Sequence, residues 1–310
     1  MKRTLSTLGI AICLVLLIRS CAFTSCTIPF SGMENTLFQG DRVIVNRWSY
    51  GLRLPFPSLI GYHRWNASIP RQGDIVVFNN PAPQTEDTPI EQRELYISRC
   101  IGAPGDTLML NEQLVNIGEE RIICPDDKTL YAYPGEREEE LADAMQKAGV
   151  FGNELMGYDK GDYIRSFSHY ELYLIKQVLE REIPFTSLQS HAASKANPFV
   201  IPARGQKVNV YPWNAKLLCN TINSHEGKKA LLRGTTLIVD GKKTNAYTFT
   251  QDYCWVASGH SVNVCDSRLF GLVPESHLIG RADMVWFSKD PTASWNEGFR
   301  WSRFFHHVTP

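Results

Sequence analysis

Two short stretches of the chain carry the hydroxyl groups that a hydrolytic site could use. The first covers residues 28–37 and contains Ser31, and the second covers residues 96–107 and contains Ser98. A serine attacks a peptide carbonyl when a base within hydrogen-bond reach takes its proton, and a buried lysine with a neutral amine can be that base. Neither stretch contains a lysine. A serine in either stretch could therefore act as a nucleophile only with a base supplied from elsewhere in the chain.

Both stretches resemble the catalytic boxes of type I signal peptidases, the signal peptidase I or leader peptidase family of serine endopeptidases. The resemblance keeps the family's order between about residues 28 and 290. The further matching segments are 40–46, 53–55, 70–78, 239–242, 247–249, 252–255, 265–274 and 277–282. One such segment would be a weak signal, whereas the ordered series identifies the chain as a member of the family. The family's activity is the cleavage of N-terminal signal peptides from exported proteins.

The family's four functional side chains are absent. The position of the nucleophilic serine, directly before Met33, is Gly32, and the position of the general-base lysine is Ser98. Phe30 replaces the serine that donates to the oxyanion, and Val264 replaces the serine that supports the lysine. We therefore assign no catalytic residue, and the resemblance predicts a family member with a degenerate Ser/Lys dyad, a pseudoenzyme.

The residues around these four positions match the family and are interpreted as a site scaffold. They are Met33, Thr36, Leu37, Arg99, Gly105, Asp106, Asp266, Ser267 and Arg268. Asp266 and Arg268 resemble an ion pair that buttresses the family's site. A scaffold kept without its reactive groups indicates selection for shape, and each of these residues has the simpler interpretation that it maintains the fold.

A relocated active site is the alternative. Ser31 is the fallback nucleophile, but a shift of one residue in an extended segment turns the side chain to the opposite face, so a local bulge would be required. A new base would then have to come from His260, Lys160 or Lys207, which the sequence does not place near the site.

Three functions remain open at this stage. The chain is a catalytically degenerate homologue that still binds extended peptides by β-strand addition, an active serine endopeptidase that cleaves signal peptides, or a non-catalytic structural subunit. The expected partners are membrane lipid, signal peptides of exported preproteins and an active signal peptidase. Because 32 Lys and Arg balance 32 Asp and Glu, no basic face for nucleic acid is expected.

The N-terminus predicts a membrane anchor. Lys2 and Arg3 precede an apolar run over residues 5–18, followed by Arg19. The run is shorter than the roughly twenty residues of a full span, and extends to residue 23 or 27 only if Arg19 reaches the interface. A cleavable signal peptide ending near residues 20–22, or a lipoprotein cleaved before Cys21, is the competing interpretation.

The charge pattern places the main domain outside a bacterial-type cytoplasmic membrane, in a single-pass topology. We favour the uncleaved anchor because the family has one. The eight cysteines match no zinc pattern, and we predict no metal and no cofactor. In an oxidising compartment some of the last five, at positions 100, 124, 219, 254 and 265, could pair.

Short β-rich runs bounded by turn residues predict a mainly β fold. The expected strands cover residues 42–46, 74–78, 95–101, 107–110, 207–210, 236–239, 253–257 and 284–288. Amphipathic patterns predict helices over 136–147 and 168–181. The fold class is therefore a signal-peptidase-like β-sheet core, with an inserted α/β accessory region and one N-terminal membrane anchor helix.

The predicted division of the chain follows from these elements. It comprises an anchor at 1–27, a β core from 28–117 and 199–290, an inserted accessory region at 118–198, and an aromatic and basic tail at 291–310. Alternating basic and aromatic residues in the tail suit a membrane interface. A short terminal helix packed on the core is the alternative, and the two are not exclusive.

Overall fold

The computed structural model describes most of the chain. The described residues are 23–28, 33, 36–54, 57, 61–83, 85, 87–111, 128–150, 153, 155–188, 196–259, 266–291 and 293–308. All strand pairs among these residues are antiparallel. The strands confirm the prediction of a mainly β fold.

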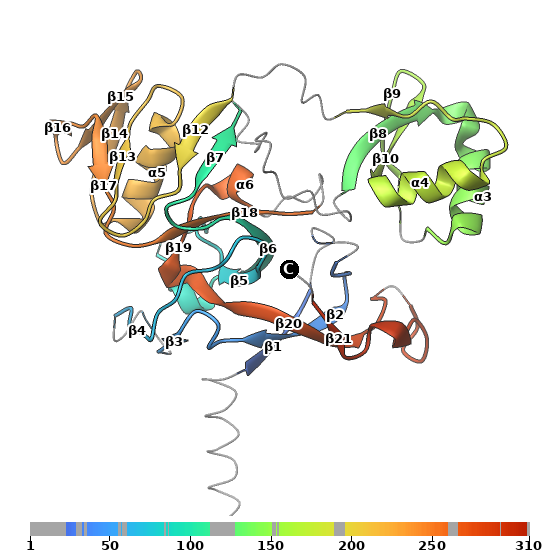
Figure 1. The fold of residues 1–310 in the computed structure, drawn as a ribbon, viewed down its shortest axis with the longest axis horizontal. Helices are drawn as coiled ribbons and strands as arrows, with labels where there is room; N and C mark the ends of the chain where they lie inside the picture. Colours follow the sequence, from blue (N-terminus) through green and yellow to red (C-terminus); the bar gives the residue numbers. More distant parts are fainter. Residues whose placement is uncertain are drawn as a thin grey trace, which may run out of the picture.

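The largest sheet is built from both ends of the chain. Its strands, among the described residues, follow the order β1-β2-β20-β5-β6-β18-β19, with β21 added beside β20 (Figure 1). The bounds are β1 (Phe23–Thr27), β2 (Asp41–Asn46), β5 (Ile75–Asn79), β6 (Leu95–Gly102), β18 (Tyr253–Ala257), β19 (Val273–Pro274), β20 (Leu278–Ser288) and β21 (His306–His307). Because β20 lies between β2 and β5, residues far apart in the sequence share the centre of the sheet.

Each face of this sheet carries its own apolar core. All five residues of β5 are buried, and alternate residues point to opposite faces. Ile75 and Val77 pack with Met33, Leu37 and their neighbours in one cluster. On the other face Val76 and Phe78 pack with Tyr50, Cys100, Cys254 and Val256. A central strand that is covered on both sides is apolar throughout, which is why 74–78 was readily predicted as a strand.

A second lobe, at the upper left of Figure 1, surrounds helix α5 (Ala215–His225). Its strands are β7 (Thr107–Leu110), β12 (Asn197–Val200), β13 (Lys207–Asn209), β14 (Ala230–Arg233), β15 (Thr236–Val239), β16 (Lys242–Lys243) and β17 (Ala246–Thr248). Leu218 and Ile222 of the helix pack with Phe199, Phe249 and Trp255. Because Trp255 belongs to β18, this core continues directly into the large sheet.

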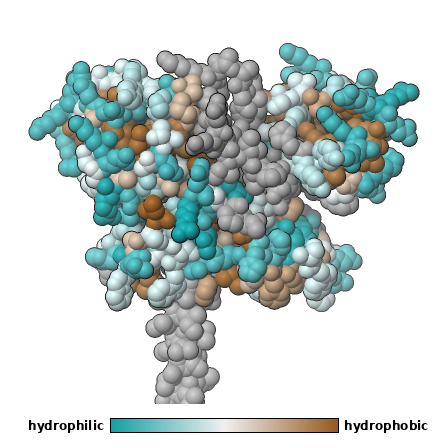
Figure 2. Space-filling model, viewed as in Figure 1, coloured by the Kyte–Doolittle hydropathy of each residue, from teal (hydrophilic) through white to brown (hydrophobic). Residues whose placement is uncertain are grey.

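The third lobe, at the upper right of Figure 1, comes from the chain between these halves. A sheet in the order β11-β8-β10-β9 is joined to two helices, with a core that includes Tyr133, Leu141 and Phe167. The elements are β8 (Lys128–Pro134), η3 (Gly135–Arg137), α3 (Glu138–Ala148), β9 (Leu155–Asp159), β10 (Asp162–Ser168), α4 (His169–Val178) and β11 (Thr186–Ser187). Apolar residues also reach the surface of this lobe (Figure 2), and Leu155 and Met156 are among the exposed ones.

The remaining elements are short. They are β3 (Leu52–Arg53), β4 (Arg64–Trp65), η2 (Ile90–Gln92), α6 (Ser267–Phe270), η4 (Glu275–His277) and η5 (Trp301–Arg303). The lobes match the predicted plan of a β core with an inserted α/β region, whereas the exact domain boundaries remain predictions.

The predicted N-terminal anchor overlaps the first described strand. The predicted anchor at 1–27 lies largely outside the described residues, but its last part, Phe23–Thr27, is strand β1 and pairs with β2. The polar, β-branched residues Thr24 and Thr27 suit an edge strand better than a membrane span. In the part of the chain that the structure describes, no helix combines the length and apolar character of a membrane span.

The C-terminal tail packs on the large sheet. Phe304 lies 5.3 Å from Phe287 of β20, measured between ring centroids, and Trp301 lies 4.9 Å from Phe304. The Arg303 guanidinium donates to the buried Asp41 carboxylate at 2.7 Å and to the Thr36 carbonyl at 2.9 Å. These contacts support the interpretation that the tail packs on the core, although the Trp301 side chain remains 69% exposed.

Candidate functional site

Ser98 occupies the middle of β6, at the position where the resemblance expects the lysine. It pairs with Val76 of β5, and its side chain is fully buried. Strand alternation puts it on the same face as Tyr96 and Cys100. The Ser98 hydroxyl donates to the Ile97 carbonyl at 2.7 Å. This geometry gives the hydroxyl a structural acceptor within its own strand.

Arg99 points to the opposite face of β6 and connects it to the first stretch. Its guanidinium donates to the Gly73 carbonyl at 3.2 Å and to the Thr36 hydroxyl at 3.3 Å. Met33 and Leu37 are buried beside this segment, and the Leu37 amide donates to the Met33 carbonyl at 2.6 Å. The structure therefore brings four predicted scaffold residues onto one face of the sheet, next to β6.

Asp266, Ser267 and Arg268 form a second group of predicted scaffold residues. The buried Asp266 carboxylate accepts from the Ser258 amide at 2.7 Å and from the Arg268 guanidinium at 2.6 Å. The Ser267 hydroxyl accepts from the Val256 amide at 2.9 Å. Because Val256 pairs with Cys100 of β6, this group is fixed beside the strand that carries Ser98.

Gly105 and Asp106 shape the turn after β6. Gly105 has a φ of +93°, which an L residue with a side chain rarely adopts. The Asp106 carboxylate accepts from the Ala103 amide at 2.8 Å, and the Gly105 amide donates to the Ile201 carbonyl at 2.9 Å. These contacts give both residues a role in the turn that follows β6.

Several predicted positions lie outside the described residues. They are Phe30, Ser31, Gly32, His260 and Val264. The other two candidates for a relocated base are both exposed, Lys160 in the turn between β9 and β10 and Lys207 at the start of β13. A lysine base needs an apolar enclosure, and neither of these side chains has one.

Lys128 is not among the predicted site residues. It is the lysine of the described residues whose side chain is enclosed by the protein, and 2% of that side chain is exposed. Its amide donates to the Gly259 carbonyl at 2.6 Å, so the first residue of β8 contacts the chain just beyond β18. Its ammonium group lies 3.3 Å from the Glu171 carboxylate. Lys128 thus contacts a carboxylate, and no local motif around it in the sequence signalled burial.

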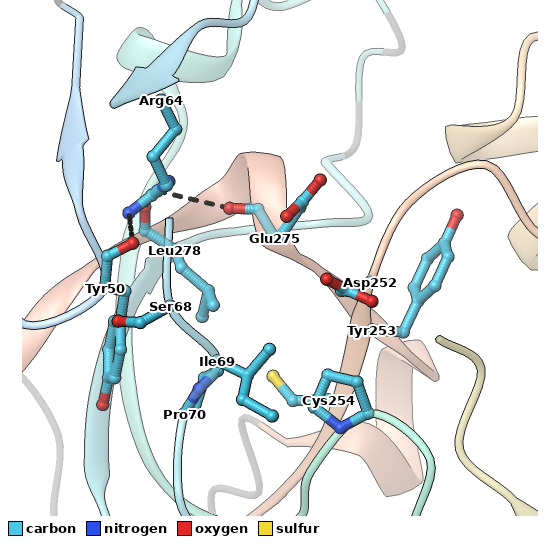
Figure 3. A pocket seen from close by; sticks show the side chains of 11 residues that line it. Tyr50, Arg64, Ser68, Ile69, Pro70, Asp252, Tyr253, Cys254, Glu275 and Leu278 are labelled. Carbon is cyan, nitrogen blue, oxygen red and sulfur yellow. Dashed lines mark hydrogen bonds between the residues drawn. The ribbon is translucent and has the colours of Figure 1, made fainter. Parts of the chain in front are cut away.

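A small pocket opens on the face of the sheet that carries Tyr50 and Cys254 (Figure 3). The Arg64 guanidinium donates across it to the Tyr50 and Glu275 carbonyls, both at 3.3 Å. Burial raises the pKa of Glu275, and the charge of Arg204 opposes this effect. The pocket volume of about 10 Å³ has room for roughly one water molecule. It is therefore too small to hold a peptide side chain.

Comparison with known proteins supports the resemblance. A family model described as "Signal peptidase, peptidase S26" matches residues 1–166. A protein named signal peptidase I from Buchnera aphidicola (subsp. Schizaphis graminum) is 26% identical over 304 residues, covering 97% of this chain and 80% of the relative. One of the same name from Haemophilus influenzae is 24% identical over 328 residues, covering 97% and 74%. A Rickettsia felis signal peptidase I is 30% identical over 126 residues, covering 39% and 44%.

Proposed function

Because the chain belongs to the signal peptidase family, peptidase S26, we propose that it is a membrane-anchored member that has lost peptidase activity and retains peptide binding. The peptides that it binds are extended segments of exported preproteins, such as their signal peptides. Its main domain lies outside the cytoplasmic membrane.

The surroundings of Ser98 carry this proposal. The family's base position is a buried hydroxyl that donates to its neighbour's carbonyl, and the family's nucleophile position is Gly32, which has no side chain. Catalytic groups of this kind act as a unit, so the loss of one removes most of the rate. The loss of both leaves a protein whose remaining capacity is binding.

The architecture of the large sheet supports the binding part of the proposal. Among the described strands, β1 and β19 end the order of the sheet, and end strands present backbone groups to which an extended chain can add. Arg99 donates to the Thr36 hydroxyl, and Arg268 pairs with the buried Asp266, so these contacts hold the segments beside β6 in place. A preserved frame of this kind suits recognition.

The surface near the C-terminus supports membrane lipid as a partner. Trp295, Trp301 and Phe305 are exposed there, and the Lys289 ammonium lies 5.3 Å from the centroid of the Phe299 ring. Exposed aromatic rings next to cations are typical of surfaces at the level of lipid headgroups. The charged N-terminus before an apolar run agrees with this placement.

The experiment is a binding titration of a fluorescent signal peptide against the purified full-length chain in detergent. The proposal predicts saturable binding that an unlabelled signal peptide displaces and a scrambled peptide of the same composition does not. Equal displacement by both peptides, or no binding at all, would favour the structural-subunit interpretation instead.

A further inference from the structure

Two cysteines meet in the apolar core between β6 and β18. Cys100 is fully buried and Cys254 is 1% exposed, and both belong to the cluster that includes Val76, Val256 and Tyr50. Neither forms a disulfide in the structure. The Cys100 thiol donates to the Gly102 carbonyl and the Cys254 thiol to the Val273 carbonyl, both at 3.6 Å, and the two thiols also interact with each other.

The strand pairing explains this contact. Cys100 pairs directly with Val256, and Cys254 lies two residues further along β18, on the same face. The register shifts between Trp255 and Val256, and such a bulge bends the strand and changes the direction of nearby side chains. Diagonal neighbours on two paired strands have Cα atoms about 7–8 Å apart, slightly beyond the range that a disulfide usually spans. Closing the bond therefore requires a backbone movement of about 1 Å.

We propose that Cys100 and Cys254 are a redox pair that closes into a disulfide across β6 and β18 when the chain folds under oxidising conditions. Each cysteine gives up one hydrogen as the sulfur–sulfur bond forms. The oxidant is a small or protein disulfide, such as oxidised glutathione, which is reduced to two thiols. The presence of such an oxidant in the cell rests on the proposed location outside the cytoplasm. The ability of the two cysteines to form a disulfide does not depend on that location.

The reaction belongs to folding because the folded core protects the thiols. Disulfide exchange requires a thiolate, and the neighbouring Cys100 thiol together with burial raises the pKa of Cys254 well above its usual range. Cys254 lines the pocket of Figure 3, but that pocket holds only about one water molecule. A disulfide oxidant therefore reaches these sulfurs before the sheet has closed.

The cross-link would join the two strands that border the candidate site. Cys100 follows Ser98 and Arg99 in β6, and β18 leads to the segment that ends at Asp266. The enclosed loop spans residues 100–254, and a long loop gives a disulfide a large effect on the entropy of the unfolded chain. The closed pair would thus stabilise the relative placement of the predicted scaffold residues.

The test is oxidative refolding of the purified full-length chain in detergent. The reduced, unfolded chain is refolded in a mixture of reduced and oxidised glutathione, quenched with acid, alkylated and digested with trypsin without reduction. Cleavage places Cys100 in peptide 100–121 and Cys254 in peptide 244–268, which also contains Cys265. A second cleavage with chymotrypsin after Trp255 separates these two cysteines before mass spectrometry.

We expect the peptide that joins Cys100 to Cys254 as the main form of both cysteines. Oxidised protein should unfold roughly 5–10 °C above reduced protein. Cys100→Ala should abolish the linked peptide and this difference, whereas the matched control Cys219→Ala, another buried free cysteine, should preserve both. If Cys100→Ala does not fold, the peptide map of the wild-type chain decides alone.

Recovery of Cys100 and Cys254 as alkylated thiols in folded, glutathione-treated protein would overturn the proposal, and so would linkage of either one to a different cysteine. The same map from cells alkylated at lysis separates this result from the question of location. Free thiols in cells combined with the linked peptide after refolding would support the pair and contradict the extracytoplasmic location.

Discussion

Ser98 shows at the scale of single residues what a restored active site would require. A lysine there would enter a core that Val76, Tyr96 and Cys100 already fill, and extra methylene groups in a packed core cost about 1–3 kcal/mol. We therefore expect Ser98→Lys alone to lower the free energy of unfolding by at least that amount, because the buried amine also loses its hydration. Ser98→Ala loses a hydrogen bond within its own strand and should change it by less than about 1.5 kcal/mol.

The restoration prediction adds the other three groups. Gly32→Ser with Ser98→Lys should give weak peptidase activity, and the further changes Val264→Ser and Phe30→Ser should make it measurable. The restored groups serve one transition state, so their effects should be strongly non-additive. Cleavage of a preprotein is the assay. A quadruple variant that is folded, as judged by circular dichroism, but inactive would mean that the site scaffold no longer has the geometry of an active family member.

Asp266 allows a sharper test of the frame. Its carboxylate is buried and accepts from the Ser258 amide and the Arg268 guanidinium. Asp266→Ala leaves both donors without their acceptor, and we expect a loss of about 2–4 kcal/mol in the free energy of unfolding. The matched control is Asp143→Ala, which removes the exposed partner of Lys147 and should cost less than about 0.5 kcal/mol. Equal effects in denaturant unfolding would contradict a structural role for the Asp266 pair.

At the scale of single elements, the junction between α5 and η4 should lose stability in acid. The rings of His225 and His277 pack with centroids 5.2 Å apart. Burial, with a contribution from Arg93, lowers the pKa of His225 to about 4, and burial also lowers the pKa of His277. Arg93 donates to Nε2 of His277 at 3.1 Å, which requires the neutral ring because arginine can only donate.

The pH dependence follows from these directions. For His225, only the unfolded chain takes up the proton between pH 6.5 and about 4, and for His277 the same holds from pH 6.5 down to its lowered pKa. The free energy of unfolding should therefore fall as the pH drops through this window, by about 1.4 kcal/mol per pH unit for each histidine. His225→Phe keeps a ring in place and should remove the contribution of one histidine to the pH dependence of the free energy of unfolding, which is measured by denaturant unfolding. The exposed control His306→Phe should leave the slope intact, and an unchanged slope in His225→Phe would refute the assignment.

Elements differ in how well the sequence predicts them. The runs 107–110, 236–239 and 253–257 are β7, β15 and β18 without error, because turn residues bound them on both sides. The sequence predicts β20 over residues 284–288, whereas this strand begins at Leu278. A Cβ at Gly280 would lie 2.2 Å from the Asn46 carbonyl. The glycine is there because β2 approaches closely, a contact that local sequence cannot reveal.

Helices also differ in how well the sequence predicts them. Ser168, the first residue of the predicted helix over 168–181, caps α4, and its hydroxyl and the Glu171 carboxylate complete a capping box. The helix ends at Val178, before the predicted end. Helix α5 was missed, although Ala215, Leu218 and Ile222 are buried at helical spacing. The candidate site was predictable as a set of positions, but the burial of Ser98 depends on strands from both ends of the chain.

For the molecule as a whole, the tail and the N-terminus bear on membrane placement. Arg303 ties the tail to Asp41 at the start of β2, and β1 is the strand next to β2, directly after the apolar N-terminal run. We expect external protease to digest the main domain in spheroplasts that express the full-length chain. A cytoplasmic marker enzyme is the control. Protection of the domain equal to that of the marker would contradict an extracytoplasmic location.

Incubation of a preprotein with the purified full-length chain in detergent tests the central claim most directly. The account predicts no cleavage at the signal junction above the background without enzyme, because Gly32 and Ser98 supply neither nucleophile nor base. Wild type and Ser31→Ala should then be indistinguishable, while an active family member cleaves the same preparation. Cleavage at the junction by the wild-type chain that Ser31→Ala abolishes would contradict the account and identify Ser31 as the nucleophile of an active peptidase.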